Sequence, residues 1–321
     1  FILMKKVFIT GGSGTVGSAF IKKYYDKYKF YSYSRNEKMQ VALKRKFPDV
    51  EIILGSVEDE NLLIGEVIKV VPDIIIHAAA LKHVDTAEKQ PKQAIDINIV
   101  GSLNIVKAAK TCNVPLTVGI STDKACMPDC VYGYTKMLME KLFLDANNVQ
   151  NKFVCCRFGN VAGSHGSVIP LWLSLKNQKK PLKLTHPKMT RLMFTQGEAA
   201  KLIQKSIELA GPAGGGFIIS KIMKSVNMHA MASIISDNVE IVGLRPGEKL
   251  NEDLISEKEL KFTCLRGDYI IIKEDKSGKE GIRLQKHLSS LTAEKMSTQE
   301  IKEIIAIVYK ELSETLLFEK Q

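Results

Sequence analysis

The amino-acid sequence predicts an α/β protein, with a doubly wound, Rossmann-like parallel sheet and a smaller C-terminal lobe interleaved with it. Three observations lead to this prediction. Short apolar runs alternate with segments of helical period through the first half of the chain, which is typical of βαβ units. A glycine-rich turn, Thr10–Gly17, follows the first apolar run. The alternation loosens after about residue 160 of 321, which leaves room for a second, smaller lobe.

The period of the apolar residues predicts the strands and helices of the first half. The expected strands are Lys6–Thr10, Phe30–Ser34, Glu51–Leu54, Asp73–His77, Leu116–Ser121 and Phe153–Phe158. Between them, segments of helical period lie near 15–26, 38–46, 60–70, 92–112 and 132–146. A parallel sheet covered by these helices follows from the alternation.

The second half is less regular. Gly211–Gly216 predicts a turn, and Leu244–Glu248 predicts a second irregular segment. The amphipathic stretch Thr298–Glu314 predicts a helix with Thr298 as its N-cap. Because the chain has no internal repeat and no low-complexity linker, we expect the second lobe to be interleaved with the first.

The composition is that of an ordinary globular protein, with 45% hydrophobic and 25% charged residues. No apolar run reaches the roughly 18 to 20 residues that a bilayer span needs. Phe1–Leu3 lack the apolar core of a signal peptide, and we interpret them as a native terminus or a remnant ahead of Met4. The six cysteines have neither metal-ligand spacing nor a secretory context. We therefore expect a soluble, cytoplasmic protein with reduced, mostly buried thiols, no bound metal and no membrane partner.

The net charge of +11 raises the question of a nucleic-acid partner. The chain has no zinc finger, no aromatic RNA-binding motif and no basic heptad region, so a lysine-rich surface is the preferred interpretation and no nucleic acid is expected. Residues 151–191 are a special case, because they contain eight Lys and Arg residues and no Asp or Glu. Such a segment can attract an anion such as a diphosphate.

The turn Thr10–Gly17 has the sequence TGGSGTVG and stands between a predicted strand and a predicted helix. Glycines at 11, 14 and 17 allow a tight turn and a close approach of the backbone to a pyrophosphate. The N–H groups and positive dipole end of the following helix would hold the phosphates. The strand, the spacing and the helix together predict a dinucleotide site.

The end of the second predicted strand favours NADP over NAD. An NAD site usually has Asp or Glu there, which accepts hydrogen bonds from the ribose 2′-hydroxyl. This chain has Ser34 and Arg35 instead. The Arg35 guanidinium can pair with a 2′-phosphate and stack on adenine.

Polar residues follow the fifth predicted strand, where open α/β sheets bind their ligands. Thr122, Asp123 and Lys124 stand at this strand end, and Tyr132 and Lys136 follow on one face of the next helix. A lysine ammonium about 4 Å from a phenol would favour the phenolate by roughly 4 kcal/mol before desolvation. We therefore expect Tyr132 to act as a base that Lys136 assists. Tyr134 is the internal competitor, but it is only two residues from Lys136 and faces elsewhere.

These motifs make the chain similar to the configuration-inverting UDP-N-acetylglucosamine 4,6-dehydratases, which are extended short-chain dehydrogenase/reductase enzymes of pseudaminic-acid-type pathways. The resemblance runs from about Lys5 to about Ile255. The matching segments are His77–Val84, Ser121–Ala125, Tyr132–Lys136, Arg157–Val161, Gly163–Val168, Met189–Arg191 and Arg245–Lys249.

The resemblance implies a role for each matching residue. The chemistry would be carried by Thr122, Asp123, Lys124, Tyr132 and Lys136. The cofactor would be bound by Thr10, Gly11, Gly14, Thr15, Gly17, Ser34, Arg35, Ala78, Ala79 and Lys136. The UDP-sugar substrate would be bound by Lys82, Asn160, Ser167, Arg191, Arg245 and Glu248. Residues 1–160, with some later segments, would then form the dinucleotide-binding domain, and 161–321 mainly a substrate-binding lobe and C-terminal helix.

The chain also departs from the family's usual residues. Gly55-Ser56 replaces Gly-Asp near the adenine, which puts that contact in doubt. Tyr134 replaces a usual Ala, His165 a usual Arg, and Cys126-Met127 a small residue and Asn. We expect these bulkier neighbours to influence sugar specificity.

The implied reaction is an internal redox dehydration. Tyr132 would take the 4-hydroxyl proton while Thr122 orients that oxygen and hydride leaves carbon 4 for the cofactor. Lys124 would remove the carbon-5 proton, Asp123 would protonate the departing 6-hydroxyl, and hydride would return to carbon 6. Reprotonation of carbon 5 from the opposite face would invert it.

Two alternatives remain open on the sequence. A nucleotide-sugar 4-epimerase would use the same Tyr/Lys pair but has no need of Asp123 and Lys124. A sensor or scaffold protein would bind NADP without turnover. In either case we expect a homo-oligomer.

Overall fold

The structure, a computed structural model, describes residues 4–274 and 281–319. Our interpretation of Phe1–Leu3 lies outside the described residues. The first half contains thirteen regular strands and α-helices in the order expected for repeated βαβ units. They are β1 (Lys6–Thr10), α1 (Thr15–Tyr24), β2 (Lys29–Ser34), α2 (Glu37–Lys46), β3 (Glu51–Leu54), α3 (Glu60–Val70), β4 (Ile74–His77), α4 (Val84–Lys89), α5 (Pro91–Ile95), α6 (Gly101–Thr111), β5 (Leu116–Thr122), α7 (Val131–Ala146) and β6 (Lys152–Phe158).

The described second half has shorter strands between its helices. In chain order they are β7 (Asn160–Val161), α8 (Val168–Asn177), β8 (Leu182–Leu184), β9 (Thr190–Phe194), α9 (Gln196–Ala213), β10 (Phe217–Lys221), β11 (Ser225–Asn227), α10 (Met228–Ile235), β12 (Val239–Ile241), β13 (Asp253–Ile255), β14 (Thr263–Arg266), β15 (Tyr269–Ile272), β16 (Ile282–Arg283), β17 (Leu288–Ser289) and α11 (Thr298–Glu319).

The described strands include one large mixed sheet with the order β16-β14-β15-β10-β6-β5-β4-β1-β2-β3. The strands from β10 to β3 pair in parallel, and β15, β14 and β16 extend the sheet by antiparallel pairing. The order β3-β2-β1-β4-β5-β6 is that of a doubly wound dinucleotide-binding sheet, which confirms the predicted fold class. The order in which successive strands are added to the sheet reverses between β1 and β4, which is where such sheets bind ligands.

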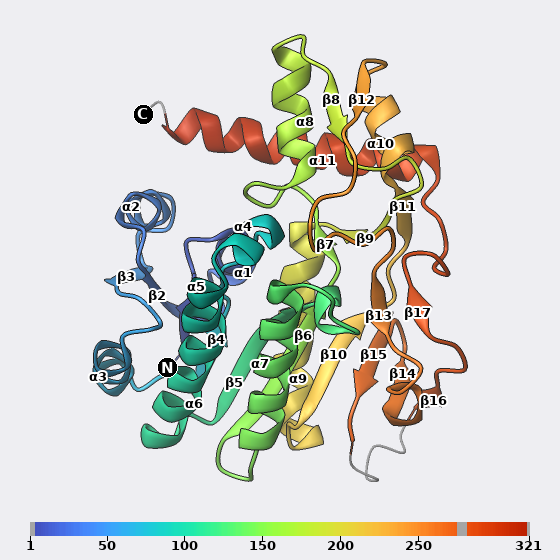
Figure 1. The fold of residues 1–321 in the computed structure, drawn as a ribbon. Coiled ribbons are helices and arrows are strands. Elements are labelled where there is room, and N and C mark those ends of the chain that lie inside the picture. The colour runs from blue at the N-terminus through green and yellow to red at the C-terminus, as the bar shows by residue number, and fades with distance from the viewer. Residues whose placement is uncertain (1–3, 275–280, 320–321) are drawn as a thin grey trace.

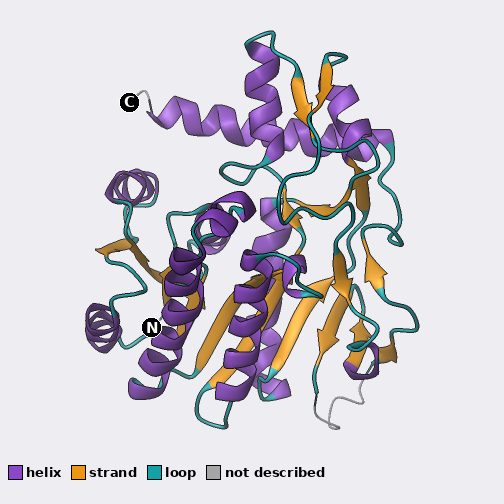
Figure 2. Ribbon diagram, viewed as in Figure 1, coloured by secondary structure: helices purple, strands orange, loops and turns teal. Residues whose placement is uncertain are grey.

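Helices cover both faces of this sheet (Figures 1 and 2). α3, α6 and α7 lie side by side on one face, and α1 packs against α9 on the other. Above the ends of the strands lies a smaller lobe built from α8, α10, α11 and the short strands β8 and β12. A three-stranded sheet, β11-β9-β7, lies between the two parts.

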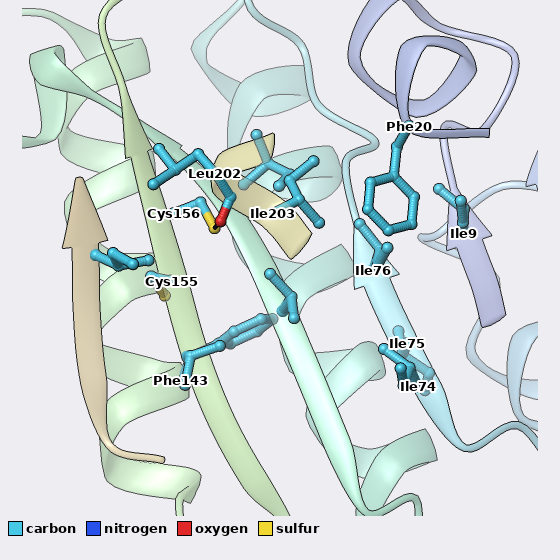
Figure 3. Close-up of a cluster of buried hydrophobic side chains, with 14 of the residues drawn as sticks. Ile9, Phe20, Ile74, Ile75, Ile76, Phe143, Cys155, Cys156, Leu202 and Ile203 are labelled. Carbon is cyan, nitrogen blue, oxygen red and sulfur yellow. Dashed lines mark hydrogen bonds between the residues drawn. The ribbon is translucent and has the colours of Figure 1, made fainter. Parts of the chain in front are cut away.

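Each part has its own cluster of buried apolar side chains. The main cluster fills both faces of the large sheet and includes Ile9, Ile75, Ile76, Phe143 and Leu202 (Figure 3). All six cysteines lie in the described chain, and five are buried, including Cys155 and Cys156 in this cluster.

The second cluster belongs to the small lobe. Trp172 of α8 packs there with Met231 of α10 and with Ile304 and Val308 of α11. α11 is therefore part of the lobe's core. Burial of its apolar side chains stabilises the lobe by about 25 cal/mol per Å² of apolar area.

Three local predictions need correction. The helical segment expected at 92–112 is interrupted by a π-helical turn, Asp96–Val100. The turn expected at Gly211–Gly216 begins only at Gly214, because α9 continues through Gly211 and Pro212. The last helix is capped by Ser297, not Thr298: the Glu300 amide donates to Ser297 Oγ (3.2 Å) and the Ser297 amide donates to Glu300 Oε2 (2.8 Å).

Among the helices of residues 4–274 and 281–319, none has the length and apolar character needed to cross a membrane.

Candidate active site

A cavity of about 690 Å³ lies between the carboxyl ends of the main sheet's strands and the small lobe. Strand-end and loop residues from both parts line it, from Gly11 at one end to Glu252 at the other. This volume is in the range of sites for small molecules and cofactors. Its position is the crevice that the doubly wound topology predicts.

The glycine-rich turn forms one wall of the cavity. A Cβ atom on Gly11 would lie 2.8 Å from the Ala79 amide nitrogen, and one on Gly17 would lie 2.6 Å from the Gly11 carbonyl oxygen. Gly11 also has a φ of +70°, which favours glycine. The N-cap of α1, Gly14, offers no side-chain cap, so the amides of the first turn face the cavity without a side-chain acceptor. These features fit a bound pyrophosphate.

The residues expected around this turn lie in different places. Thr15, Ala78 and Ala79 line the cavity. Thr10 does not, because its buried hydroxyl lies 2.8 Å from Nδ1 of His77. Thr10 therefore supports the turn from beneath instead of lining the site. Burial, aided by Lys136, lowers the pKa of His77 to about 3, so the imidazole is neutral.

Ser34 and Arg35 lie at the far end of the same wall. Arg35 is exposed and lines the cavity, and Ser13 donates a hydrogen bond to Ser34 (3.1 Å). The Asp or Glu that NAD sites usually have at this position is absent from the sequence, which has Ser34 and Arg35 there.

The Gly55-Ser56 departure has a local explanation. A Cβ on Gly55 would lie 2.3 Å from the Tyr33 hydroxyl, so only glycine fits beside this ring. Ser56 donates a short hydrogen bond to Glu58, and both residues line the cavity. A carboxylate is therefore present at this end of the site, two residues beyond the expected Asp position.

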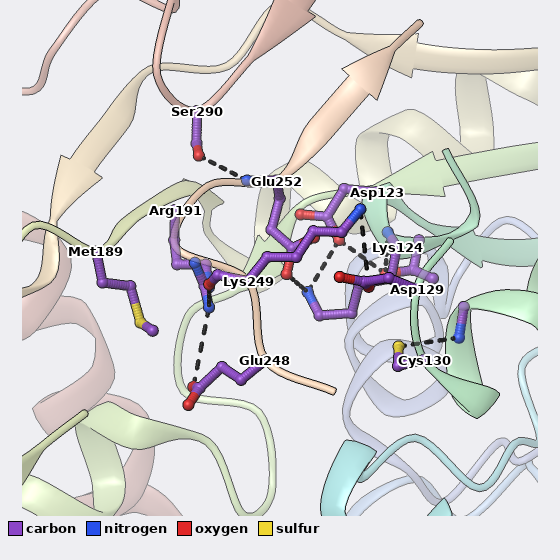
Figure 4. A network of polar contacts seen from close by, with 12 residues as sticks. Asp123, Lys124, Asp129, Cys130, Met189, Arg191, Glu248, Lys249, Glu252 and Ser290 are labelled. Carbon is purple, nitrogen blue, oxygen red and sulfur yellow. Dashed lines mark hydrogen bonds and ion pairs between the residues drawn. The ribbon is translucent and has the colours of Figure 1, made fainter. Parts of the chain in front are cut away.

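Thr122, Asp123 and Lys124 line the cavity at the end of β5, and Figure 4 shows Asp123 and Lys124 with their polar partners. Asp123 is 1% exposed. Its Oδ1 accepts hydrogen bonds from the Thr122 hydroxyl (2.9 Å) and from Lys124 Nζ (3.1 Å). Its Oδ2 is buried and has no hydrogen-bond partner among the described residues. A buried oxygen of this kind is available to a ligand.

Lys124 has a second acidic partner that sequence reasoning missed. Glu252, just before β13, is buried and its Oε1 lies 3.0 Å from Lys124 Nζ (Figure 4). Burial by itself would lower the pKa of Lys124, but Asp123 and Glu252 outweigh it and raise that pKa. Arg191 lowers that pKa, but Asp123 and Glu252 outweigh it because both carboxylates contact the ammonium directly. Glu252 lies 128 residues from Lys124 in the chain, and no motif signals the pairing.

Tyr132 lines the cavity beside these residues. Burial raises its pKa to about 12, while Lys124 and a hydrogen bond with Thr122 lower it and Asp123 raises it. Lys136 is buried, and its Nζ donates to the Ile120 carbonyl (2.7 Å). Burial lowers the pKa of Lys136 to about 8. Among the described lysines, Lys124 is thus the one that lowers the pKa of Tyr132, and assistance of the phenol by Lys136 stays a prediction. Tyr134 is 49% exposed and lies outside the cavity lining.

The residues expected to bind substrate all line the cavity, but their partners differ. Asn160 Oδ1 and Ser167 Oγ are buried without a hydrogen-bond partner among the described residues. Lys82 is exposed at the rim. The exposed Arg245 guanidinium donates to Glu248 Oε1 (3.1 Å).

The Arg191 guanidinium forms its hydrogen bonds with the backbone. It donates to the carbonyl oxygens of Thr190 (2.8 Å), Lys249 (2.9 Å) and Leu250 (3.1 Å). In this arrangement Arg191 holds the segment that carries Glu248 in the cavity wall.

Most basic residues of the acid-free segment 151–191 lie outside the cavity lining. Only Lys183 and Arg191 of its basic residues line the cavity. Arg157 is buried and pairs with Glu140 (2.7 Å) and Glu259 (2.8 Å). The acids that neutralise it come from outside the segment, which the sequence could not show.

Among the other departures from the usual residues, only His165 lines the cavity. Its Nδ1 lies 2.8 Å from Thr15 Oγ1, so the loop of the second half closes against the start of α1. Cys126 is buried with its Sγ 3.4 Å from Glu259, and Met127 is 61% exposed. Cys126, Met127 and Tyr134 do not line the cavity, and their influence on sugar specificity stays a prediction.

Asn98 also escaped sequence reasoning. It lies in the π-helical turn and is fully buried. Its side chain accepts from the Leu81 amide (2.8 Å) and donates to the Leu81 carbonyl (3.0 Å) and to Thr135 (3.0 Å). Asn98 thus fixes the Ala79–Lys82 segment against α7, and the helix irregularity that places it here is typical of functional sites.

Sequence comparison relates the chain to characterised groups. The family described as "Polysaccharide biosynthesis protein" matches residues 7–274. The chain is 37% identical over 281 residues to the UDP-N-acetylglucosamine 4,6-dehydratase (inverting) of Campylobacter jejuni, with 84% of this chain and 82% of that protein covered. It is 33% identical over 329 residues to the UDP-glucose 4-epimerase of Rickettsia bellii, with 94% and 95% covered.

Solved structures have the same fold. Pen from Bacillus thuringiensis superimposes with a TM-score of 0.87 at 28% identity, covering 95% of this chain and 98% of that one. DesIV from Streptomyces venezuelae, a dTDP-glucose 4,6-dehydratase with NAD and TYD bound, superimposes with a TM-score of 0.66 at 20% identity, covering 76% and 86%.

Proposed function

Because the chain belongs to the polysaccharide biosynthesis protein family, we propose that it is a nucleotide-sugar-modifying enzyme, and specifically an NADP-dependent UDP-N-acetylglucosamine 4,6-dehydratase that inverts carbon 5. The observation that carries this proposal is the Asp123–Lys124 pair in the cavity beside Tyr132. An elimination across carbons 5 and 6 needs a base and an acid on adjacent atoms. A 4-epimerisation has no elimination step and therefore no use for this second acid–base pair.

The residues around Tyr132 suit the first step. Tyr132 takes the proton of the 4-hydroxyl, and Thr122 orients that oxygen. The dinucleotide, when bound, supplies the redox chemistry by taking hydride from carbon 4 and returning it to carbon 6. Burial raises the pKa of Tyr132, and the nearby charge of Lys124 lowers it, which favours loss of the phenol proton.

Asp123 and Lys124 suit the elimination. The carbon-4 ketone acidifies carbon 5, Lys124 removes that proton, and Asp123 protonates the 6-hydroxyl as it leaves as water. Moving one proton along the 3.1 Å contact from Lys124 to Asp123 turns the ion pair into the neutral base and neutral acid that this step needs. Asp123 then gives this proton to the leaving hydroxyl, and Lys124 takes the carbon-5 proton. After the elimination Lys124 is again an ammonium and Asp123 again a carboxylate.

The other cavity residues divide between the two ligands. Asn160, Ser167, Lys82, Arg191, Arg245 and Glu248 would form the sugar-nucleotide side. The turn from Gly11 to Gly17 and the Ser34–Arg35 end would hold the dinucleotide. In this proposal residues 1–160, with later strands of the main sheet, mainly bind cofactor and 161–321 mainly bind substrate. A cytoplasmic, homo-oligomeric enzyme remains our expectation.

The main alternative is a nucleotide-sugar 4-epimerase. The similarity to the Rickettsia bellii enzyme over 94% of the chain favours it, and Tyr132 would serve that reaction as well. Asp123 and Lys124 would then have no chemical task, although both are held in the cavity wall.

One experiment separates the two reactions. The purified protein is incubated with NADP and UDP-N-acetylglucosamine in deuterated water and followed by proton NMR. We expect a 4-keto-6-deoxy sugar with deuterium at carbon 5 and inverted configuration there. Formation of the 4-epimer with no loss of water would overturn the dehydratase proposal.

A further inference from the structure

Lys124 lies between two buried carboxylates that come from distant parts of the chain. Its Nζ is 3.1 Å from Asp123 Oδ1 and 3.0 Å from Glu252 Oε1. The side chains of Asp123 and Glu252 are 1% and 4% exposed, whereas that of Lys124 is 18% exposed and faces the cavity. The ammonium is thus held between two buried carboxylates and is partly exposed, in the lining of the cavity.

Glu252 is itself held rigidly. Its amide donates to Ser290 Oγ (2.9 Å), and its carbonyl accepts from the Ser290 amide (2.8 Å). β13 continues from it and pairs with β17. The carboxylate therefore belongs to the framework of the second half, while Lys124 belongs to the end of β5 in the first.

The charged and titratable groups near this pair come from several elements. Asp123 acts on Lys124 from the adjacent residue, and Arg191 acts on it from β9. Tyr132 and Cys130, at the start of α7, are also close enough to interact with Lys124. Lys249 is turned away, donating to the Met127 carbonyl (2.5 Å) and lying 3.7 Å from Asp129 (Figure 4). Glu252 is thus the one acid besides Asp123 for which the described residues show a contact with the Lys124 ammonium.

We propose that Glu252 is a positioning residue, whose carboxylate fixes the Lys124 ammonium at the cavity wall and sets the pH range in which Lys124 serves as a base. Asp123 cannot fill this role alone, because as the acid of the proposed reaction it takes a proton and then gives it to the leaving group. Glu252 keeps its negative charge beside Lys124 through that exchange. It acts through Lys124 and is not proposed to touch the sugar.

The charge of Glu252 opposes loss of the Lys124 proton. Two opposite charges at about 3 Å attract by several kcal/mol at an effective dielectric of about 20. Removing the negative charge therefore makes the neutral amine at least roughly tenfold more abundant at a given pH, which is one pKa unit. The role of Lys124 as the carbon-5 base rests on the proposed function. The effect of Glu252 on the Lys124 ammonium does not, because it follows from the 3.0 Å contact between them.

The coupling can be measured without any turnover. Cyanate, which carbamylates neutral amines, is added to the full-length protein at pH 9, and modification of Lys124 is quantified by peptide mass spectrometry against exposed Lys89. In the parent we expect Lys124 to react at least tenfold more slowly than Lys89. In Glu252→Gln we expect Lys124 to react at least tenfold faster than in the parent.

Two further variants complete the test. Glu252→Asp keeps the charge at a greater distance, so Lys124 should react only a few times faster than in the parent. Glu257→Gln removes a different carboxylate, an exposed one in the segment after β13, and should leave the Lys124 rate unchanged. If Glu252→Gln fails to fold, the parent comparison and the Asp variant still decide the matter. Equal Lys124 rates in the parent and in the Glu252 variants would overturn the proposal.

The reaction provides a separate readout. The pH dependence of deuterium incorporation at carbon 5 should move to lower pH by about one unit or more in Glu252→Gln. A purely structural role would lower the rate at all pH values without this shift. Should the carbamylation rates change as expected while the parent incorporates no deuterium at any pH, the positioning role stands and the proposed dehydratase function fails.

Discussion

At the scale of single residues, burial and nearby charge decide what each side chain in the cavity does. Lys136 is buried and Lys124 is partly buried, and both line the cavity, yet their pKa values move in opposite directions. Lys136 faces a backbone carbonyl, so burial dominates and its pKa falls to about 8. Lys124 faces two carboxylates, and its pKa rises. Spacing from Tyr132 alone could not distinguish them.

Replacing Tyr132 with Phe should leave folding and sugar-nucleotide binding intact and lower turnover by about 10²-fold or more, which is the usual loss when a general base is removed. Steady-state kinetics and calorimetric titration with UDP-N-acetylglucosamine measure the two effects. Tyr134→Phe is the matched control, because Tyr134 lies outside the cavity and its variant should keep parental turnover. Near-parental activity of Tyr132→Phe would place the base elsewhere.

Replacing Lys124 with Ala should allow the first oxidation and block the elimination. Reduced cofactor would then accumulate on addition of substrate, visible as a slow rise in absorbance near the reduced-nicotinamide band. Solvent deuterium should no longer enter carbon 5. Formation of the 4-keto-6-deoxy product at the parental rate would show that another group is the base.

Replacing Arg35 with Asp should weaken NADP binding far more than NAD binding, because a carboxylate would face the 2′-phosphate. Calorimetric titration of both cofactors measures the difference. Lys38→Asp makes the same charge change at an exposed position outside the cavity lining, and it should change both affinities little. Equal losses for NADP and NAD in Arg35→Asp would mean that Arg35 does not read the phosphate.

At the scale of secondary-structure elements, a buried ion-pair network fixes the strand end that carries the site. Arg157 of β6 donates to Glu140 of α7 (2.7 Å) and to Glu259 (2.8 Å), and Ser121 at the end of β5 also donates to Glu140 (2.6 Å). The network thus ties β5, β6, α7 and the segment after β13 together. Breaking a buried pair of this kind leaves an uncompensated charge and usually costs about 3–5 kcal/mol.

Glu259 gives this network a pH dependence. Burial alone would raise its pKa, but Arg157 and Ser256 outweigh burial and lower it to about 2. A carboxyl whose folded-state pKa is depressed stabilises the fold above its unfolded pKa of about 4.3 and loses that contribution as the pH falls toward about 2. Glu259→Gln should therefore lower the free energy of unfolding by on the order of 2 kcal/mol at pH 7, and the difference from the parent should shrink below about pH 4.

Urea unfolding at pH 7 and at two or three acidic pH values measures this difference. A matched variant, Glu257→Gln, changes an exposed carboxyl in the same segment and should show almost no effect at either pH. A difference between parent and Glu259→Gln that is constant with pH would mean that the Arg157 ion pair is not its source.

At the scale of the whole molecule, two cores meet at the cavity, and α11 connects the parts that carry them. Ile304 and Val308 of α11 pack into the second cluster. On the same helix, Glu311 accepts a hydrogen bond from Gln196 of α9 (2.7 Å), and Glu314 lies 3.1 Å from Lys22 of α1. The helix therefore contacts both the lobe and the helices behind the main sheet (Figure 1).

Replacing Ile304 with Ala should lower the free energy of unfolding by about 2–4 kcal/mol, because it removes buried methyl groups and leaves a cavity. Ile307 lies on the same helix but is 41% exposed, so Ile307→Ala should cost about 0.5 kcal/mol or less. Denaturant unfolding of the two variants measures both values. Equal losses would show that α11 is not packed as the structure has it.

Much of the architecture could be predicted from the sequence, because it depends on local patterns. The strands of the first half begin and end within one residue of their predicted bounds, since each is a short apolar run beside a turn. The glycine turn was recognisable because its geometry requires glycine at particular positions of one short segment. The cap of the last helix was misplaced by one residue, since Ser297 and Thr298 are adjacent and both are residue types that cap helices.

Contacts between distant segments were decided only by the tertiary structure. The sequence placed Thr122, Asp123, Lys124 and Tyr132 close together because one strand end and one helix start carry them. It gave no sign that Glu252 pairs with Lys124. Nor did it show that Glu140 and Glu259 pair with Arg157. The hydrogen bonds from the Arg191 guanidinium to the carbonyl oxygens of Lys249 and Leu250 were equally unpredictable. The physical reason is that a side chain's charge and hydrogen bonding depend on what lies within about 4 Å of it, and the sheet order brings those neighbours from anywhere in the chain.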